Sequence, residues 1–450
     1  MVRRLTIQIN YQHAWHDAAI LEFPDLLNSS RCRLDYEMSH VLKPEFYQQF
    51  ADSAISVRLP IESMPFRQHN WFKFIDDIMP AGSSRNYWLR KLGLTDENLA
   101  ARNFELLSRG TIAPIGNVRI KESIPERPEN PIVVHFTVED VCRLEVDFIE
   151  YAQANGAAAG GASGAGGAAP KLLVRRSQDG GIWIDTFQDT PDNTDIRYLV
   201  KFPRGVNDID KDILRAEYHF YHELHALGFN TIPLEHMMLE ESARGPSLWL
   251  PRFDSIIIDN KEQLLGLESV YSILGAAPGT PMLHGDVIRG IIQVLSNPDI
   301  YGNTTTLLDE DDGIAKFVIE WVRRDLLNIA FGNSDNHGRN TSFIKMNNNV
   351  SLSPIYDFAP MKADPETITR TFTWGQNLEL GGRFHFDGIA ESLRDLVEPL
   401  LLLTELKVTA ESLIGLRERL ATRGVTDSIL NFPSMSYQDL RVKFELWGLL

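Results

Sequence analysis

The feature that most constrains the fold of this chain is a polar segment between a long apolar helix and a strand. The pattern of "GIAKFVIEWVRRDLLNIAF" predicts a helix that ends at Phe331, and "TSFIKM" predicts a strand. Between them lies "GNSDNHGRN", with an aspartate, a histidine, an arginine and three asparagines. Because burying unpaired polar groups costs free energy, other parts of the chain must bring partners to this segment.

A second polar residue stands where an apolar one is expected. "DILRAEYHFYHELHALGF" predicts a helix with Glu217 on its apolar stripe, and the preceding strand "YLVKFP" holds Lys201 among apolar neighbours. A pairing of Lys201 with Glu217 would satisfy both charges. The stripe itself is formed by Ile213, Ala216, Phe220, Leu224 and Leu227.

The spacing within the polar segment suggests a chemistry. Asp335 and Asn340 stand five residues apart, and Asp357 follows a predicted hairpin in "YDFAP". Protein kinases use the same order in H-R-D-x-x-x-x-N and D-F-G, where the first aspartate accepts the substrate proton and the other two residues hold metal ions. Mg²⁺ prefers such oxygen ligands. The sequence therefore predicts transfer of phosphate from ATP, with Lys201 on the phosphates.

The tract "NGAAAGGASGAGGAAPK", residues 155–171, has two readings. Its composition is typical of a flexible linker. It also leads into a predicted hairpin at "KLLVRR", and glycine-rich loops let backbone N–H groups approach phosphates closely.

The bulk composition sets the class of protein. A chain of 450 residues with 43% hydrophobic and 23% charged residues is globular and should form two or three domains. We expect an α+β, two-lobed protein-kinase-like fold with an extra N-terminal mixed β/α subdomain (1–125), a kinase N-lobe (126–255) and an all-helical C-terminal lobe (256–450). Cys32 and Cys142 are the only cysteines and no apolar run reaches about 20 residues, which favours the cytoplasm and no membrane. The net charge of −17 disfavours direct binding of nucleic acid.

With these motifs, the chain resembles the HipA-like serine/threonine kinases, which are toxin components of bacterial toxin–antitoxin pairs. The N-terminal motifs that carry the resemblance are "SVRLPI", "WFKFIDDIMPAGSSR" and "NFELLSRG". The motifs of the kinase core are "GGASGAGGAAPK", "YLVKFP", "AEYHFYHELHALGFNTIP", "LPRFD", "SDNHGRNTSF" and "LSPIYDFAP".

The resemblance assigns roles to individual residues. It implies Asp335 as the catalytic base and Asn340 and Asp357 as magnesium ligands. It implies a phosphate-binding loop formed by Gly164, Gly166, Gly167, Ala168, Ala169, Pro170 and Lys171. It places the nucleotide beside Lys201, Glu217, Pro251, Arg252, Phe253, His337, Arg339, Asn340, Tyr356 and Asp357, with Pro251 to Phe253 at the adenine hinge.

The resemblance also implies regulation and partners. Family members can autophosphorylate a serine in the phosphate loop, and Ser163 is the serine of this tract. The family partner is a helix-turn-helix antitoxin of the HipB type, so contact with DNA would come only through that partner. The typical substrate is an aminoacyl-tRNA synthetase, whose phosphorylation arrests growth.

Two alternatives stay open. A lipid or small-molecule kinase would fit the same loop, because phosphoinositide kinases carry a similar D-x-H-x-x-N pattern. A kinase fold without activity would act as a co-repressor or binding module. A second motif, "LHGDV", resembles the loop of aminoglycoside-type phosphotransferases but lacks the asparagine, since Ile291 stands there, and we expect Asp286 to cap a helix instead.

Overall fold

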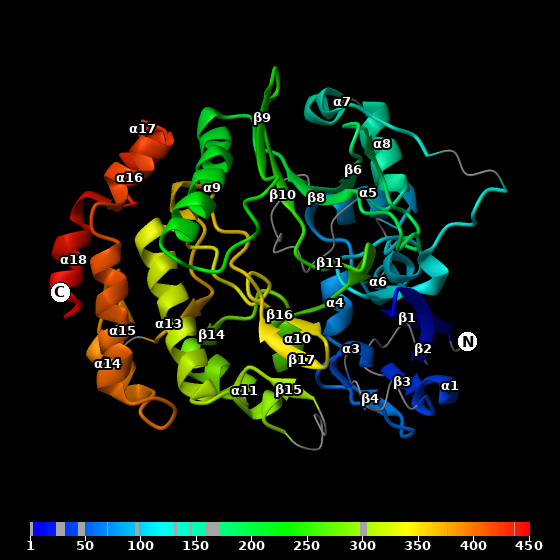
Figure 1. Ribbon diagram of the computed structural model, residues 1–450, viewed down its shortest axis with the longest axis horizontal. Coiled ribbons are helices and arrows are strands. Elements are labelled where there is room, and N and C mark those ends of the chain that lie inside the picture. Colours follow the sequence, from blue (N-terminus) through cyan, green and yellow to red (C-terminus); the bar gives the residue numbers. More distant parts are fainter. Residues whose placement is uncertain are drawn as a thin grey trace.

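The computed structural model describes residues 3–23, 32–43, 50–69, 71–94, 99–129, 133–144, 146–157, 171–297, 304–375, 377–435 and 437–450. The N-terminal strands and the C-terminal helices lie at opposite ends of the molecule (Figure 1). Within the described ranges, no helix has both the length and the apolar character that a bilayer crossing requires.

The N-terminal unit, by which we mean the described residues up to 123, is built on a five-stranded antiparallel sheet in the order β4-β3-β2-β1-β5. The strands predicted at "RLTIQIN" and "RCRLDYE" are confirmed as β1 and β3, and in β3 buried and half-buried residues alternate. Its strands are β1 (Arg3–Tyr11), β2 (Ala14–Phe23), β3 (Cys32–Tyr36), β4 (Phe66–Gln68) and β5 (Val118–Ile120). Its helices are α1 (Met38–Val41), α3 (Phe50–Ser53), α4 (Phe74–Ile78), α5 (Gly82–Lys91), α6 (Leu99–Arg109) and the 3₁₀ turn η1 (Lys121–Ser123).

The central sheet is also five-stranded and antiparallel, in the order β7-β6-β8-β10-β9. Its two faces join different cores, because side chains alternate along each strand. On β8, Tyr198 and Val200 pack with α7 and α8, while Leu199 faces α9. The elements are α7 (Val138–Arg143), α8 (Val146–Ala154), β6 (Lys171–Arg176), β7 (Ile182–Trp183), β8 (Ile196–Lys201), α9 (Asp208–Ala226), β9 (Met238–Ser242) and β10 (Gly245–Pro251).

The register of this sheet places two lysines side by side. Lys171 of β6 lies directly opposite Lys201 of β8. Each is two residues from a leucine, Leu173 or Leu199, that packs in the core shared with α9. Both lysines therefore point to the face of the sheet that α9 covers, and Glu217 belongs to α9.

The rest of the chain mixes helices with short strands, so the expectation of an all-helical C-terminal lobe is wrong. Strand β13 pairs with β16 within a four-stranded sheet ordered β13-β16-β17-β15. Strands β13 and β15 are four and two residues long and pair with segments more than 40 positions away, so no local periodicity announced them, whereas β16 and β17 form the hairpin that the sequence predicted. The mixed α/β content agrees with the broad fold class that the sequence predicted.

The helix predicted to end at Phe331 and the strand at "TSFIKM" are confirmed as α13 and β16. The strands of this part are β11 (Ser255–Ile258), β12 (Lys261–Leu264), β13 (Gly266–Ser269), β14 (Met282–Leu283), β15 (Thr305–Thr306), β16 (Ser342–Met346), β17 (Asn349–Leu352), β18 (Phe372–Thr373), β19 (Glu379–Leu380) and β20 (Arg383–Phe384). The helices are α10 (Val270–Leu274), α11 (His284–Leu295), α13 (Gly313–Phe331), α14 (Phe386–Ser392), α15 (Pro399–Ser412), α16 (Leu416–Arg423), α17 (Asp427–Leu430) and α18 (Leu440–Leu446), with 3₁₀ turns η3 (Met361–Ala363) and η4 (Tyr437–Asp439).

Buried carboxylates join the N-terminal unit to the rest of the chain. Glu268 of β13 accepts hydrogen bonds from the Ser56 hydroxyl (2.6 Å) and the Val57 amide (2.9 Å). In the opposite direction, Asp77 of α4 accepts from the Ser269 amide at 2.9 Å. These bonds satisfy charged groups that would be costly to bury alone, so they fix the position of α4 against β13.

Asp77 gives this junction a pH dependence. Burial raises the pKa of Asp77 to about 7, although the Ser269 hydrogen bond opposes the shift. The unfolded chain has the ordinary value of about 3.9, so the folded protein binds more protons between these values and loses stability as pH rises through them. We expect Asp77→Asn to gain about 2–3 kcal/mol in unfolding free energy relative to wild type between pH 5 and pH 8.

Urea unfolding at the two pH values measures this gain. Asp208→Asn is the control, since the Asp208 side chain is 95% exposed. It should follow wild type at both pH values, and a parallel course of Asp77→Asn and wild type would contradict the assignment.

Candidate active site

Six of the predicted residues, Glu217 and His337 among them, line one cavity. A cavity of about 290 Å³ lies where the central sheet and α9 meet the segments that follow α13 and β17, and its lining includes Lys171, Lys201, Asp335 and Asp357. These residues extend over 186 positions of the chain, from Lys171 to Asp357, and converge only in the folded protein.

Lys201 lies at the centre of a buried charge network. It is 4% exposed, its Nζ lies 2.5 Å from a carboxylate oxygen of Glu217, and it also contacts the Asp357 carboxylate. Burial disfavours its charged form, but the two carboxylates outweigh burial and raise the pKa of Lys201 above its ordinary value. The pairing expected from the misplaced carboxylate on the apolar stripe is present.

Glu217 is held in place by a second partner. The Tyr221 hydroxyl, one helical turn further along α9, donates a hydrogen bond to Glu217 at 2.9 Å. The same hydroxyl accepts the Phe358 amide at 3.3 Å, so α9 is tied to the residue that follows Asp357. The orientation of the Lys201 ammonium is thus set by groups from two separate segments.

Asp357 occupies a conformation that few side chains adopt. Its φ is +52°, in the left-handed region that aspartate tolerates better than most residues. Lys171 Nζ lies 3.3 Å from its carboxylate and Lys201 contacts it as well. Burial opposes ionisation of this group, but the two lysines hold the pKa of Asp357 below its usual range.

The segment after α13 is folded on itself by its asparagines. Gly332 ends α13 at φ +73°, where a Cβ would lie 2.5 Å from the Met435 side chain. The Asn333 side-chain oxygen accepts the Asp335 amide at 3.2 Å, and Asn340 Nδ2 donates to the Asp335 carbonyl at 2.6 Å. These bonds explain the asparagines, because they close a tight loop that presents the Asp335 side chain to the cavity.

Asp335 is shifted toward its protonated form. Burial raises its pKa, and the Asp357 carboxylate raises it further, while His337 opposes the shift. His337 Nε2 lies 3.3 Å from the Asp335 carboxylate. A carboxylate whose pKa lies above its ordinary value is a better proton acceptor than an exposed aspartate.

One polar atom in the loop lacks a protein partner. Asn340 Oδ1 is buried and has no hydrogen-bond partner among the described residues. Because Nδ2 is used on the Asp335 carbonyl, the amide orientation leaves this oxygen as a vacant acceptor. A magnesium ion takes amide and carboxylate oxygens as ligands, so Asn340 and Asp357 fit the ion that the sequence predicted.

The predicted hinge residues lie around a smaller adjoining cavity. Pro251, Arg252, Phe253 and Tyr356 line a space of about 40 Å³ that shares Lys201 and Asp357 with the larger one. The rings of Phe253 and Tyr356 have centroids 5.4 Å apart. This apolar extension beside two charged groups has the character of a site for a flat ring.

The other predicted residues fall in three places. His337 lines the large cavity. Arg339 does not line either cavity, and its guanidinium donates to the Asp76 carbonyl of the N-terminal unit at 2.9 Å. Ser163, Gly164, Gly166, Gly167, Ala168, Ala169 and Pro170 lie outside the described residues.

The sequence did not reveal Arg204 and Asp364, which also line the cavity and form an ion pair at 3.1 Å. Arg204 follows "KFP" in what reads as a plain polar turn, so no local signal marked it.

The expectation that Asp286 caps a helix is wrong: Leu283 is the N-cap of α11, and Asp286 lies in the first turn. His284 is buried and stacks on Trp374, with ring centroids 4.7 Å apart.

Comparisons with known proteins identify the family. The model of the HipA-like C-terminal domain matches residues 163–418, more than half of the chain. The chain therefore belongs to the HipA-like family, as the resemblance of its motifs predicted.

One solved structure shares this fold over nearly the whole chain. HipA of Shewanella oneidensis MR-1, from a toxin–antitoxin complex with HipB and operator DNA, superposes with a TM-score of 0.63 at 13% identity, covering 99% of this chain and 98% of that chain. The Helicobacter pylori proinflammatory kinase CtkA matches with a TM-score of 0.33 at 12% identity, covering 57% of this chain and 87% of that one. No curated protein sequence matches the chain.

Replacing Asp357 tests the charge network through stability. At pH 7, Asp357→Asn leaves two buried lysines without this carboxylate, and we expect a loss of about 3 kcal/mol in unfolding free energy. The native pKa of Asp357 is depressed, so its contribution is present above the unfolded value of about 3.9 and is lost as pH falls below it. The difference from wild type should therefore shrink in acid.

Denaturant unfolding at pH 7 and below pH 4 checks this expectation. Asp192→Asn, at an exposed position, should match wild type throughout. A loss for Asp357→Asn that is the same size in acid would show that its ionisation does not stabilise the fold.

Proposed function

We propose that this chain is an ATP- and Mg²⁺-dependent serine/threonine protein kinase and the toxin of a toxin–antitoxin pair. The observation that carries the proposal is the single cavity shared by Lys171, Lys201, Asp335 and Asp357. It combines two cations that can hold phosphates, a proton acceptor and a second carboxylate, and the vacant amide oxygen belongs to Asn340, which lines a neighbouring cavity that shares Asp335 and His337 with this one. Phosphoryl transfer needs this combination, because its catalysis is mainly positioning and charge neutralisation.

The two lysines act on the phosphates of ATP. Lys201 is fixed by Glu217, so its ammonium is oriented before the nucleotide arrives. Lys171 lies opposite it in the sheet register and reaches the same carboxylate, Asp357. Burial in the cavity strengthens the attraction of both ammonium groups for phosphate oxygens, since the local dielectric is lower than in water.

Asp335 acts as the general base. Its carboxylate takes the proton of the substrate hydroxyl as that oxygen forms its bond to the γ-phosphorus of ATP, and the bond from this phosphorus to the β–γ bridging oxygen breaks. ADP leaves with the bridging oxygen. His337, 3.3 Å from the carboxylate, is placed to stabilise the charged form of Asp335 between turnovers.

Asn340 Oδ1 and Asp357 would hold Mg²⁺, which supplies positive charge to the phosphates. The buried vacant oxygen of Asn340 supports this role. Asp357 now lies between two lysines, which is consistent with a site that balances anionic and cationic charge around a nucleotide.

The toxin role and the partner rest on the family and on one fold relative. The Shewanella HipA was solved with HipB and operator DNA, which supports a helix-turn-helix antitoxin of the HipB type as the partner of this chain. With a net charge of −17, contact with DNA would then depend on the partner. The protein substrate that we propose, an aminoacyl-tRNA synthetase, follows from the family resemblance.

Labelled ATP with Mg²⁺ in a cell extract tests the kinase activity. Wild type should transfer label to a discrete protein band, and Asp335→Asn should lower the rate by at least about 10²-fold, because a positioned base contributes 10²–10⁴. Asp286→Asn is the matched control: it is an exposed aspartate in α11 that does not line the cavity.

Each other result has a definite meaning. Label in the lipid fraction would show that the activity is that of a lipid kinase. Absence of label with wild type would favour an inactive co-repressor. Equal labelling by wild type and Asp335→Asn would remove Asp335 from the role of base.

A binding measurement tests the metal ligands separately. We expect Asn340→Ala to lose the Mg²⁺-dependent part of ATP affinity in calorimetry, since a ligand oxygen is removed while Lys171 and Lys201 remain. Asn431→Ala, at an exposed position beyond α17, should bind as wild type does. Unchanged affinity in Asn340→Ala would exclude Asn340 as a magnesium ligand.

A further inference from the structure

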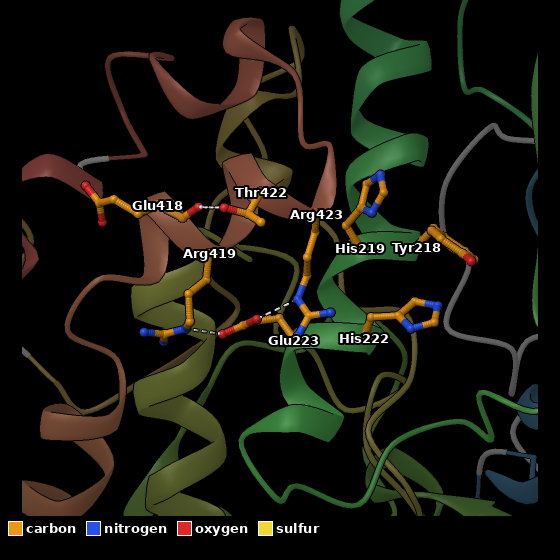
Figure 2. Close-up of a pocket in the computed structure, with 8 residues that line it drawn as sticks. All are labelled: Tyr218, His219, His222, Glu223, Glu418, Arg419, Thr422 and Arg423. Atoms are coloured by element: carbon orange, nitrogen blue, oxygen red, sulfur yellow. Dashed lines mark hydrogen bonds and ion pairs between the residues drawn. The ribbon is translucent and has the colours of Figure 1, made fainter.

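A second cavity lies on another side of α9, away from the site described above. It has a volume of about 610 Å³ and is formed between α9 and α16 (Figure 2). None of its lining residues lines the cavity that holds Lys201 and Asp335. They are Tyr218, His219, His222 and Glu223 of α9 and Glu418, Arg419, Thr422 and Arg423 of α16.

The floor of this cavity carries excess positive charge. Glu223 is 1% exposed, and its two carboxylate oxygens accept Nε of Arg419 at 2.5 Å and Nε of Arg423 at 2.6 Å. One carboxylate thus faces two guanidinium groups. Glu418 does not offset this charge at the floor, because Figure 2 shows its carboxylate directed away from Arg423.

The two arginines differ in how many of their guanidinium nitrogens already donate a hydrogen bond. Arg419 also binds the carbonyls of Ile414 (2.7 Å) and Ser412 (2.8 Å), so all three of its nitrogens are used. For Arg423, the bond from Nε to Glu223 is the one hydrogen bond found among the described residues. Its terminal amino groups can therefore donate to a ligand, and Figure 2 shows this side chain reaching from α16 to α9 between Glu223 and His222.

His222 adds a polar atom that lacks a partner. Its Nε2 is buried and has no hydrogen-bond partner within the described part of the chain. The ring lies against Tyr218, with centroids 4.6 Å apart. Burial lowers the pKa of His222, and Arg423 lowers it further, which is the response expected of an imidazole in a positive environment that has no anion.

His219 shares this environment. Its pKa is lowered by burial, then by His222 and Arg423. A Cβ added to Gly424, at φ +106°, would lie 3.3 Å from its ring, so a larger residue there would crowd the imidazole. The cavity thus combines an arginine with free donors and two imidazoles, in a chain whose net charge is −17.

We propose that the cavity between α9 and α16 is a binding site for the phosphate monoester of a small phosphorylated molecule. The terminal amino groups of Arg423 and the Nε2 of His222 would donate to the phosphate, and arginine suits phosphate because its planar fork donates two parallel bonds. Glu223 leaves one net positive charge on Arg419 and Arg423, and a phosphate anion offsets it. The volume exceeds that of phosphate alone and leaves room for an organic part beside Tyr218.

The second cavity and the candidate active site share one helix. Glu217, which pairs with Lys201, belongs to α9, as do Tyr218, His219 and His222. The phosphate site nevertheless stands on its own residues, so it does not depend on kinase activity.

Inorganic phosphate is the probe for the first test. With the histidine ring nitrogens labelled by ¹⁵N, the NMR signals of His219 and His222, assigned from variants at each position, should move saturably in phosphate and not in chloride of equal ionic strength. His337 lines the other cavity and reports phosphate bound there. If His219 and His222 keep their signals at all phosphate concentrations, the proposal fails.

Variants in calorimetry give the second test. Arg423→Gln should weaken phosphate binding about tenfold, as expected for loss of charge-assisted hydrogen bonds. Arg417→Gln is the matched control, since Arg417 lies on α16, outside the cavity, and bonds to Asn431. His222→Phe keeps the ring next to Tyr218 and the Glu223 ion pairs, and should also lose about tenfold. Wild-type affinity in folded samples of Arg423→Gln and His222→Phe would overturn the proposal.

Discussion

The contact of Lys201 with both Glu217 and Asp357 is the constraint on which the site depends. A buried lysine with no partner would lose its proton or unfold the site, so β8, α9 and the segment after β17 must all be in place together. Buried ion pairs add little net stability, because desolvation cancels most of the attraction. Their effect here is positional: the network fixes where charge stands in the cavity.

Apolar packing provides the stability that this network does not. Phe220 of α9, Phe331 at the end of α13 and Phe358 beside Asp357 form a buried aromatic group, with ring centroids 5.0–6.2 Å apart. These rings belong to the segments that carry Glu217, Asp335 and Asp357. The hydrophobic core therefore aligns the proposed catalytic residues directly. Arg339 adds a link from the polar loop to the N-terminal unit, through the Asp76 carbonyl.

Local patterns predicted the strands and helices that carry the site, β8, α9, α13 and β16, and its main charged residues. Glu217 was recognisable because a carboxylate on an apolar stripe needs a partner, and Lys201 was the nearest candidate. The asparagines of the loop and Asp357 followed from spacing. The strand β13, the Glu268 junction, and the pair of Arg204 with Asp364 were not predictable in this way, since each depends on residues more than 70 positions apart. The cavity between α9 and α16 joins Glu223 to Arg423, 200 positions along the chain, and no periodicity encodes such a contact.

The most direct measurement is a crystal structure of the chain with Mg²⁺ and a non-hydrolysable ATP analogue. The account predicts that the phosphates lie against Lys171 and Lys201 and that Asn340 Oδ1 and Asp357 hold the metal ion. It places the adenine ring beside Phe253 and Tyr356. A triphosphate bound on another surface, or a metal ion that touches neither Asn340 nor Asp357, would contradict it.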